Sequence, residues 1–403
     1  MKLIHHGAHE GVTGSCHQLN WGNGNGLLVD CGIFQGDEAR KHPSPEINFS
    51  LSGIESLLLT HVHIDHAGRL PYLLATGFDH PIFCSHPTAK LLPLVMEDAL
   101  KIGFTRSRKL ISRFLKKINC LLCPVDYDKW HPIAGSASIR LRPAGHVLGS
   151  TIFEVKLPSG EVVVFTGDIG TGNDPLLRKP TSPPAADLLV LESTYGDKIH
   201  DASKNRQQAL EDVLRRTLQD RGVTIIPAFS LGRTQAILYE MNGIFERLQE
   251  ESGNSLLKQV DVIVDSPLAS RFTELYKSMK DYWGREAQHL MQTDDQPLVF
   301  ENLTTVNSHR EHKDTLAYLD KQKLPAIVIA GSGMCTGGRV LNYLKRFIAN
   351  PTTDLVFVGY QASGTPGHLI SRGCDWVRLN GRKYDVGATV HQMQGYSAHG
   401  DQS

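Results

Sequence analysis

The sequence carries no excess of charge, few cysteines and no long apolar run. Its 403 residues include 42 Lys and Arg against 42 Asp and Glu, so the formal net charge is zero. This balance excludes a histone-like polycation and an acidic disordered tail, although a neutral protein can still carry one basic groove for a nucleic acid. The seven cysteines are scattered and odd in number, which argues against a disulfide-stapled secreted domain and favours a reduced, cytoplasmic compartment.

Membrane and targeting patterns are also missing. The N-terminal sequence MKLIHHGAHEG has no apolar core of signal-peptide length. No segment approaches about 18 consecutive apolar residues, so a membrane span is not expected. At about 100–200 residues per domain, the length predicts two or three domains.

The first part of the chain reads as short strands separated by Gly- and Asn-rich turns. A helix is expected over residues 69–76, and strands at 151–157 and 161–166 are expected to form a hairpin. The apolar segment 187–191 is expected to be a buried strand. Strands on either side of a few helices predict a layered α/β sandwich.

The pattern changes near Gly196. Strand-like segments at 223–227, 260–265, 326–330 and 354–359 alternate with helical patterns. Such alternation predicts a parallel sheet with helices on its faces. We therefore expect a second α/β domain inserted into the first.

Three histidines and one aspartate fall within six residues of the segment THVHIDHAG. His61 and His63 are two apart, so an extended backbone puts them on one side. Asp65 and His66 lie where the next helix begins, and they can turn toward a second point. Imidazole nitrogen and carboxylate oxygen suit Zn²⁺, and Mn²⁺ or Fe can also use them. The segment thus predicts a two-metal site, with an exposed polar loop as the alternative.

Further candidate ligands lie at the ends of predicted strands. His146 follows a strand in PAGHVLGS, and Asp168 follows the strand at 161–166. A carboxylate there can bridge two metals, which lie about 3.5–4 Å apart in two-metal hydrolases. Each residue alone would be read as structural, but the histidines of 61–66 favour the ligand interpretation. Asp30 is either an acceptor for a ligand histidine or a turn-starting residue.

These motifs resemble the metallo-β-lactamase superfamily. The pattern HVHIDH at 61–66, single residues His146 and Asp168, and a late His399 in GYSAHGD all match it. The Ser-Ala-His context is similar to the β-CASP branch of RNA and DNA nucleases, which includes the mRNA 3′-end processing endonuclease subunit and short prokaryotic ribonucleases. The resemblance covers essentially the whole chain and implies an αββα sandwich with an inserted β-CASP α/β domain.

The resemblance also implies domain boundaries. The metallo-β-lactamase domain would occupy residues 1–196, the β-CASP domain 197–366, and the return to the first domain 367–403. Family members continue well past the Ser-Ala-His motif with a strand and a helix that close the sandwich. Since this chain stops four residues after His399, the resemblance implies either a truncated C-terminal part or a core that closes differently.

Carried over residue by residue, the resemblance implies two Zn²⁺ ions, with Mn²⁺ also allowed. One ion would be held by His61, His63 and His146, and the other by Asp65, His66 and His399. Asp168 and a water or hydroxide would bridge them. Two further β-CASP motifs match at Glu192 and His368.

The implied reaction is hydrolysis of RNA by the metal-bridged hydroxide. His368, oriented by Glu192, would act as general acid and protonate the leaving oxygen. The expected catalytic residues are Asp65, Asp168, Glu192 and His368. Single-stranded RNA in the cytoplasm is the expected substrate; DNA, the endonuclease or 5′-exonuclease mode, and a homodimer are left open.

Two glycine-containing segments join predicted strands to helices. In AGSGMCTGGR, glycines let backbone N–H groups approach an anion at a helix N-terminus. We interpret Ser332, Gly333, Gly337 and Arg339 as an RNA-phosphate cradle, with a tight strand–helix turn as the alternative. Arg233, in FSLGRT, is expected either to contact a phosphate or to cap local carbonyls.

Basic residues crowd residues 101–117, with apolar residues between them. A solvated helix face and a basic rim that adds salt-dependent affinity for RNA both fit this pattern.

Two other functions compete with the ribonuclease. A hydrolase of a small ester, thioester or lactam would keep the metals, but it would not need the inserted domain. A non-catalytic RNA-binding scaffold would not need the complete ligand set.

Overall fold

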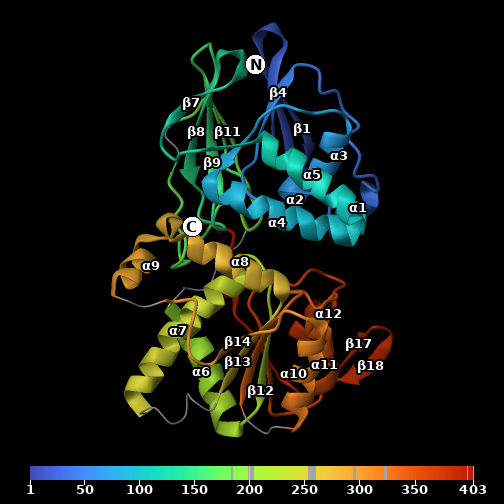
Figure 1. Ribbon diagram of the computed structural model, residues 1–403, viewed down its shortest axis with the longest axis vertical. Coiled ribbons are helices and arrows are strands. Elements are labelled where there is room, and N and C mark those ends of the chain that lie inside the picture. Colours follow the sequence, from blue (N-terminus) through green and yellow to red (C-terminus); the bar gives the residue numbers. More distant parts are fainter. Residues whose placement is uncertain are drawn as a thin grey trace. The chain divides into compact units, whose positions relative to one another are not determined.

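The computed structural model describes residues 1–182, 185–197, 199, 204–252, 260–293, 296–321, 325–396 and 398–402. The chain divides into two compact units (Figure 1). The first comprises Met1–Gly172, Leu177–Lys198 and His399–Ser403, and the second Asn173–Leu176 and Ile199–Ala398. The second unit is therefore inserted into the chain of the first.

Two sheets form the first unit. A six-stranded sheet has the order β1-β2-β3-β4-β5-β6, and a five-stranded sheet has the order β11-β10-β9-β8-β7. The strands of the first sheet are β1 (Lys2–Gly7), β2 (Cys16–Trp21), β3 (Asn25–Val29), β4 (Ile54–Leu58), β5 (Ile82–Ser85) and β6 (Leu122–Val125). Those of the second are β7 (Trp130–Pro132), β8 (Ser138–Pro143), β9 (Thr151–Lys156), β10 (Val162–Phe165) and β11 (Leu188–Val190). Leu19 and Leu58 of the first sheet share a buried cluster with Phe153 and Phe165 of the second, so the two sheets face each other.

The helices of the first unit lie between strands of the first sheet along the chain. They are α1 (Gly36–Lys41), α2 (Ile64–Ala67), α3 (Leu70–Ala75), α4 (His86–Gly103) and α5 (Arg108–Leu121). The Ser85 and Ser107 side chains accept hydrogen bonds from N–H groups in the first turns of α4 and α5, which stabilises both helix starts. Helix α4 packs on β5 and β6, and α5 packs on α4.

Most of the sequence-based expectations for this unit are confirmed. The helix expected over 69–76 is α3, and the expected hairpin is the antiparallel pair of β9 and β10. The strand expected over 187–191 is β11, but the prediction that it is buried is wrong, because Leu189 and Leu191 are 48% and 58% exposed. β11 lies at an edge of its sheet, and a short apolar run does not distinguish an edge strand from a central one.

The second unit is built on a parallel six-stranded sheet with the order β14-β13-β15-β12-β16-β19, which confirms the expected alternation. Its strands are β12 (Val223–Pro227), β13 (Asp261–Asp265), β14 (Leu303–Thr305), β15 (Ala326–Ala330), β16 (Thr353–Phe357) and β19 (Thr389–Gln392), and β17 (Trp376–Leu379) and β18 (Arg382–Asp385) form a separate ribbon. The helices are α6 (Lys204–Asp220), α7 (Arg233–Ser252), α8 (Pro267–Ser278), α9 (Arg285–Leu290), α10 (His309–Lys321), α11 (Val340–Phe347) and α12 (Pro366–Ser371).

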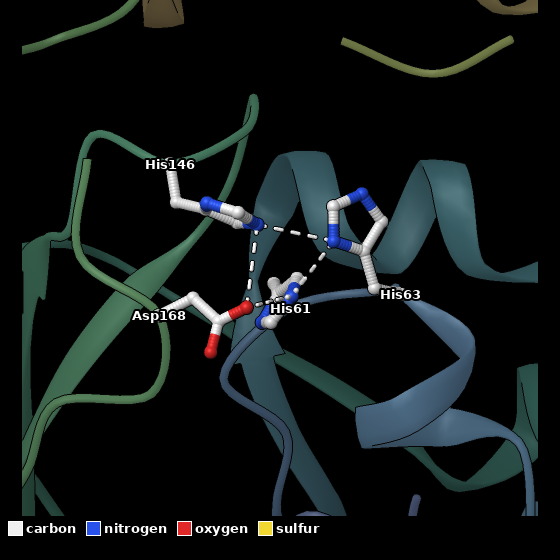
Figure 2. A group of neighbouring side chains, drawn as sticks. All are labelled: His61, His63, His146 and Asp168. Atoms are coloured by element: carbon white, nitrogen blue, oxygen red, sulfur yellow. Dashed lines mark hydrogen bonds and ion pairs between the residues drawn. The ribbon is translucent and has the colours of Figure 1, made fainter. Parts of the chain in front are cut away.

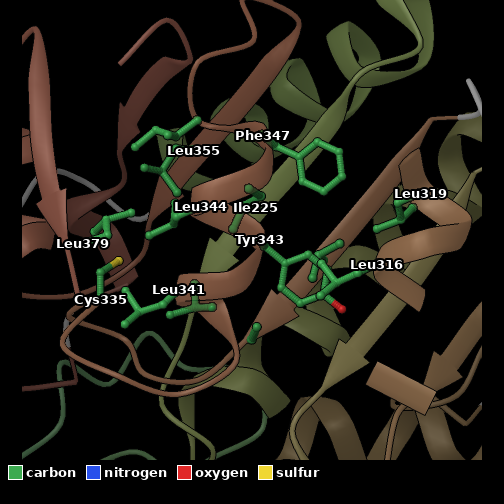
Figure 3. Packing of buried hydrophobic residues seen from close by; sticks show 14 of the residues in the cluster. Ile225, Leu316, Leu319, Cys335, Leu341, Tyr343, Leu344, Phe347, Leu355 and Leu379 are labelled. Carbon is green, nitrogen blue, oxygen red and sulfur yellow. The ribbon is translucent and has the colours of Figure 1, made fainter. Parts of the chain in front are cut away.

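Apolar side chains of the strands and of α10 and α11 make the core of the second unit. Figure 3 shows Ile225 and Leu355 of the sheet with Leu316, Tyr343 and Leu344 of the two helices. Burying one such aliphatic or aromatic side chain contributes about 1.5–3 kcal/mol. This core fixes the loops at the carboxyl ends of the strands.

The return of the chain to the first unit occurs later than residue 367. Strand β19 pairs with β16, so residues 367–398 lie with the second unit, and only His399–Ser403 lie with the first. The four residues of β19 are half-buried or exposed, so they do not form the apolar run that marks a buried strand in a sequence.

None of the described helices is long and apolar enough to cross a membrane.

Candidate metal centre

The loop that carries the histidines folds around the buried carboxylate of Asp30. Thr60 donates its N–H to Asp30 Oδ1 at 2.8 Å and its hydroxyl to Oδ2 at 2.9 Å. The Ser15 hydroxyl donates to Oδ2 at 3.1 Å, and His66 Nδ1 lies 2.7 Å from the same oxygen. Of the two interpretations of Asp30, the structure favours the acceptor for a predicted ligand histidine, and it shows that this histidine is His66. Ser15 and Thr60 were not predicted as partners of Asp30, because they are 15 and 30 residues away along the chain.

Close backbone contacts hold this loop in place. A Cβ atom at Gly32 would lie 1.5 Å from the carbonyl oxygen of Asp65, so only glycine fits there. The N–H of Thr151 donates to the Thr60 carbonyl at 3.0 Å, which ties the β8–β9 loop to the histidine loop. In that loop, Ser150 Oγ accepts the N–H of His146 at 2.9 Å.

Four predicted ligands converge on one point (Figure 2). His63 Nδ1 lies 3.1 Å from His61 Nε2 and 3.1 Å from His146 Nε2. Asp168 Oδ2 lies 3.5 Å from His61 Nε2 and 3.4 Å from His146 Nε2. Ligands about 2.0–2.1 Å from a tetrahedral Zn²⁺ lie about 3.3–3.4 Å from one another. These four residues therefore fit a cation of that size.

The other oxygen of Asp168 faces a different set of side chains. Asp168 Oδ1 lies 3.1 Å from His66 Nε2, and Asp65 Oδ2 lies 4.0 Å from the same nitrogen. His399 Nδ1 instead lies 3.9 Å from Asp168 Oδ2, the oxygen that also faces His61 and His146. The structure thus brings all seven predicted ligands together, with the two carboxylate oxygens of Asp168 turned toward different histidines.

Glu192 has a partner that the sequence did not predict. His399 Nδ1 lies 3.0 Å from Glu192 Oε2, and Asp168, Glu192 and His399 form a second group able to hold a cation. In the second unit, His368 Nδ1 lies 3.1 Å from the carbonyl oxygen of Gln361. Since a carbonyl only accepts, Nδ1 of His368 carries a proton. The orientation of His368 by Glu192 stays a prediction.

Burial and charge set the protonation of the cluster. Burial, with His66 and other histidines nearby, holds the pKa of His61 well below its usual value, so its imidazole is neutral and keeps a lone pair for a cation. Burial would raise the pKa of Asp168, but His66, His61 and His146 outweigh it and hold that pKa well below its usual value. Burial opposes protonation of His66, but the carboxylates of Asp168 and Asp30 outweigh it and raise the pKa of His66 well above the usual value of a histidine. A proton on His66 therefore competes with a cation for its lone pair.

The predicted RNA-binding residues lie in the second unit after β12 and β15. Ser332 Oγ accepts the N–H of Thr336 at 3.1 Å, and Gly333 is buried. The Arg339 guanidinium donates to Asp265 and, at 2.9 Å, to the carbonyl oxygen of Val306. This arginine therefore has a structural role that the sequence did not reveal.

Arg233 and Gly337 complete that set. Arg233 is the first residue of α7 and is half-buried. Burial lowers the pKa of its guanidinium, while the carboxylates of Asp174 and Glu240 act in the opposite direction. Gly337 lies half-buried in the loop before α11. Phosphate contacts by these residues stay predictions.

Comparison with known proteins decides the family. Residues 14–227 match the Metallo-beta-lactamase superfamily, and residues 234–370 match the Beta-Casp domain. The chain belongs to the metallo-β-lactamase superfamily. The Beta-Casp domain places it in the β-CASP branch.

Relatives of this β-CASP protein differ in length. It is 34% identical to ribonuclease TTHA0252 of Thermus thermophilus, over 100% of this chain and 89% of the relative. It is 30% identical to the transcription termination factor FttA of Methanosarcina mazei, over 93% of this chain but only 59% of that protein. A crystal structure of a protein of unknown function from Enterococcus faecalis V583 shares the fold, with a TM-score of 0.52 and 12% identity over 98% of this chain and 88% of that one.

Proposed function

We propose that this β-CASP protein is a zinc-dependent ribonuclease that hydrolyses phosphodiester bonds of single-stranded RNA. The observation that carries the proposal is the position of Asp168. Its Oδ2 lies 3.5 and 3.4 Å from His61 and His146, and its Oδ1 lies 3.1 Å from His66. One carboxylate shared between two donor sets is the arrangement of a two-metal hydrolase. The ribonuclease name of the Thermus relative supports RNA as the substrate.

In this proposal the donors divide into two sets that Asp168 joins. One set is His61, His63 and His146, and the other is Asp65, His66 and His399. Nitrogen and carboxylate oxygen donors suit Zn²⁺, and Mn²⁺ can use the same set. When bound, two such cations lower the pKa of a coordinated water and offset the charge that develops on the scissile phosphate.

In the proposal, Glu192 orients the ring of a ligand histidine, and His368 transfers a proton. Glu192 accepts from His399 Nδ1, 3.0 Å away, which fixes the ring and leaves the lone pair on Nε2. His368 donates its Nδ1 proton to Gln361, so the proton that its imidazolium can deliver is on Nε2. We assign His368 the protonation of the leaving oxygen, for which a histidine is suited near neutral pH.

The phosphate contacts belong to the same proposal. Ser332, Gly333 and Gly337 lie in a loop whose backbone can approach an anion. Arg233 and Arg339 add positive charge beside the two loops, although Arg339 is already paired with Asp265. We propose that these residues line the path of the RNA backbone in the second unit.

End-labelled single-stranded RNA tests the function directly. We expect cleavage by the zinc-loaded protein, loss of cleavage with a chelator, and recovery when Zn²⁺ is added back. Asp168→Asn should bind fewer zinc ions by elemental analysis and lose cleavage. Asp128→Asn is the matched control, since the Asp128 side chain is 63% exposed. Cleavage by a zinc-free protein would contradict the proposal, and so would turnover of a chromogenic lactam or thioester without any turnover of RNA.

A further inference from the structure

A run of unpaired positive charge lies on helix α5 of the first unit and just before it. No Asp or Glu occurs between Asp98 and Asp126. The basic residues Arg106, Arg108, Lys109, Arg113, Lys116 and Lys117 are all exposed there. None of the six has a carboxylate partner among the residues that the structure describes, whereas the preceding Lys101 pairs with Glu97 at 2.6 Å. In a chain with no net charge, this is a local feature rather than general basicity.

Four of these cations share one side of α5. Successive helical residues are about 100° apart, so Lys109, Arg113, Lys116 and Lys117 fall within an arc of about 100°. The buried residues Ile111 and Ile118 lie on the opposite side, toward α4. We call the four cations the basic stripe. It runs about 12 Å along the helix axis, with neighbours three or four residues apart.

The stripe is unfavourable for the free protein. Like charges at these spacings repel each other on a helix surface, and no described carboxylate offsets them. A row of anions laid along the helix would remove this repulsion and release the counterions that each partner holds.

Exposed apolar side chains occur close to the stripe along the chain. Ile102, Phe104 and Leu110 are 81%, 52% and 52% exposed, and the ring of Phe104 meets the ring of Tyr72 edge-on. Proteins bind single strands by stacking bases on exposed aromatic rings while cations pair with the phosphates, and Phe104 supplies such a ring five residues before Lys109.

We propose that the basic stripe of α5 is a second RNA-binding surface, separate from the metal centre, which holds single-stranded RNA by its backbone. The inference rests on the proposed ribonuclease function. Helix α5 contributes none of the seven predicted metal ligands. The stripe therefore acts on affinity for long RNA and not on the chemical step.

The test neutralises the stripe with Lys109→Gln, Arg113→Gln, Lys116→Gln and Lys117→Gln. The matched control neutralises four exposed cations of the second unit, Lys280, Arg310, Lys313 and Lys321, in the same way. In cleavage assays we expect the stripe variant to raise KM for long RNA, with kcat and zinc content unchanged. A substrate of a few nucleotides should be cut as by the wild type.

Binding is measured in the Asp168→Asn background, which blocks cleavage, with fluorescent single-stranded RNA at increasing salt. Four phosphate contacts on a single strand contribute about 2.8 to the salt slope. The stripe-intact protein should therefore lose about 50-fold more affinity than the stripe variant between about 50 and 200 mM salt. The control variant should keep the full slope.

Three results would overturn the inference. The first is an unchanged slope in the stripe variant, and the second is an equal loss in the control variant. The third is loss of binding to phosphatidylserine vesicles with RNA binding intact, which would assign the stripe to an anionic membrane surface. If the zinc-loaded protein cleaves no RNA at all, the binding measurement still shows whether the stripe binds RNA. The ribonuclease proposal and the stripe proposal can therefore be refuted separately.

Discussion

Replacing Asp30 by Asn tests how the metal centre is held, because the change keeps the size of the side chain and removes its charge. The carboxylate meets only donors: the N–H and hydroxyl of Thr60, the hydroxyl of Ser15, and Nδ1 of His66. An amide has one acceptor and one donor end. If the amide oxygen stays on the Thr60 N–H, the amide NH₂ faces His66 Nδ1, which must then accept. Asp30 has a φ of 59°, a conformation that Asn also tolerates.

The expected effect of this change is on metal affinity. The His66 ring would carry its proton on Nε2, the nitrogen that lies 3.1 Å from Asp168 Oδ1. A protonated Nε2 has no lone pair for a cation. Loss of a partner that orients a ligand costs about 10–100-fold in metal affinity, or about 1.4–2.7 kcal/mol. Asp30→Asn should therefore lower the affinity for one of the two metal ions and leave the affinity for the other unchanged.

Calorimetric titration of metal-free protein with Zn²⁺ is the assay. The wild type should bind two ions, and Asp30→Asn should bind one with unchanged and one with reduced affinity. Asp128→Asn, at a side chain that is 63% exposed, should behave as the wild type. Denaturant unfolding of the metal-free proteins checks that the fold is kept. Two ions bound by Asp30→Asn with wild-type affinities would refute the reasoning.

Two further predictions concern stability. Tyr396 donates its hydroxyl to the buried Glu240, so Tyr396→Phe should lower the free energy of unfolding by about 1–3 kcal/mol in denaturant titrations; an unchanged midpoint would show that this hydrogen bond contributes nothing. Burial lowers the pKa of His17 from 6.5 to about 4. The unfolded chain therefore takes up this proton at higher pH than the folded one, and the metal-free protein should lose about 3 kcal/mol as the pH falls from 6.5 to about 4. His17→Gln should remove that loss, and an identical pH profile in the variant would contradict the assignment.

The side chains that converge in the candidate metal centre could be predicted from the sequence because most of them are close together along the chain. His61 to His66 occupy one loop and one helical turn, and this spacing is itself the pattern. Most of the parallel sheet of the second unit could also be predicted, because its four strands of five residues, β12, β13, β15 and β16, alternate with apolar-faced helices. Both features depend on local periodicity, which the sequence shows directly.

Partners that are distant in sequence could not be predicted. Asp30 and Thr60 are 30 residues apart, and Arg339 and Asp265 are 74 apart. A carboxylate or a guanidinium gives no sign in the sequence of whether a partner neutralises it in the fold. The exposure of β11 was missed for a related reason, because the position of a strand within its sheet is set by contacts between segments and not by its own composition.

The position of His399 has a consequence for the order in which the site is assembled. Its carboxylate partner Glu192 lies 207 residues earlier in the chain, with the second unit between them. At about 5–20 residues per second, a ribosome needs roughly 10–40 s to synthesise that interval. During this time the emerging polypeptide holds six of the seven predicted ligands. The proposed metal centre is thus completed only after the inserted domain has been translated, so under this proposal the growing chain becomes an active nuclease only near the end of its synthesis.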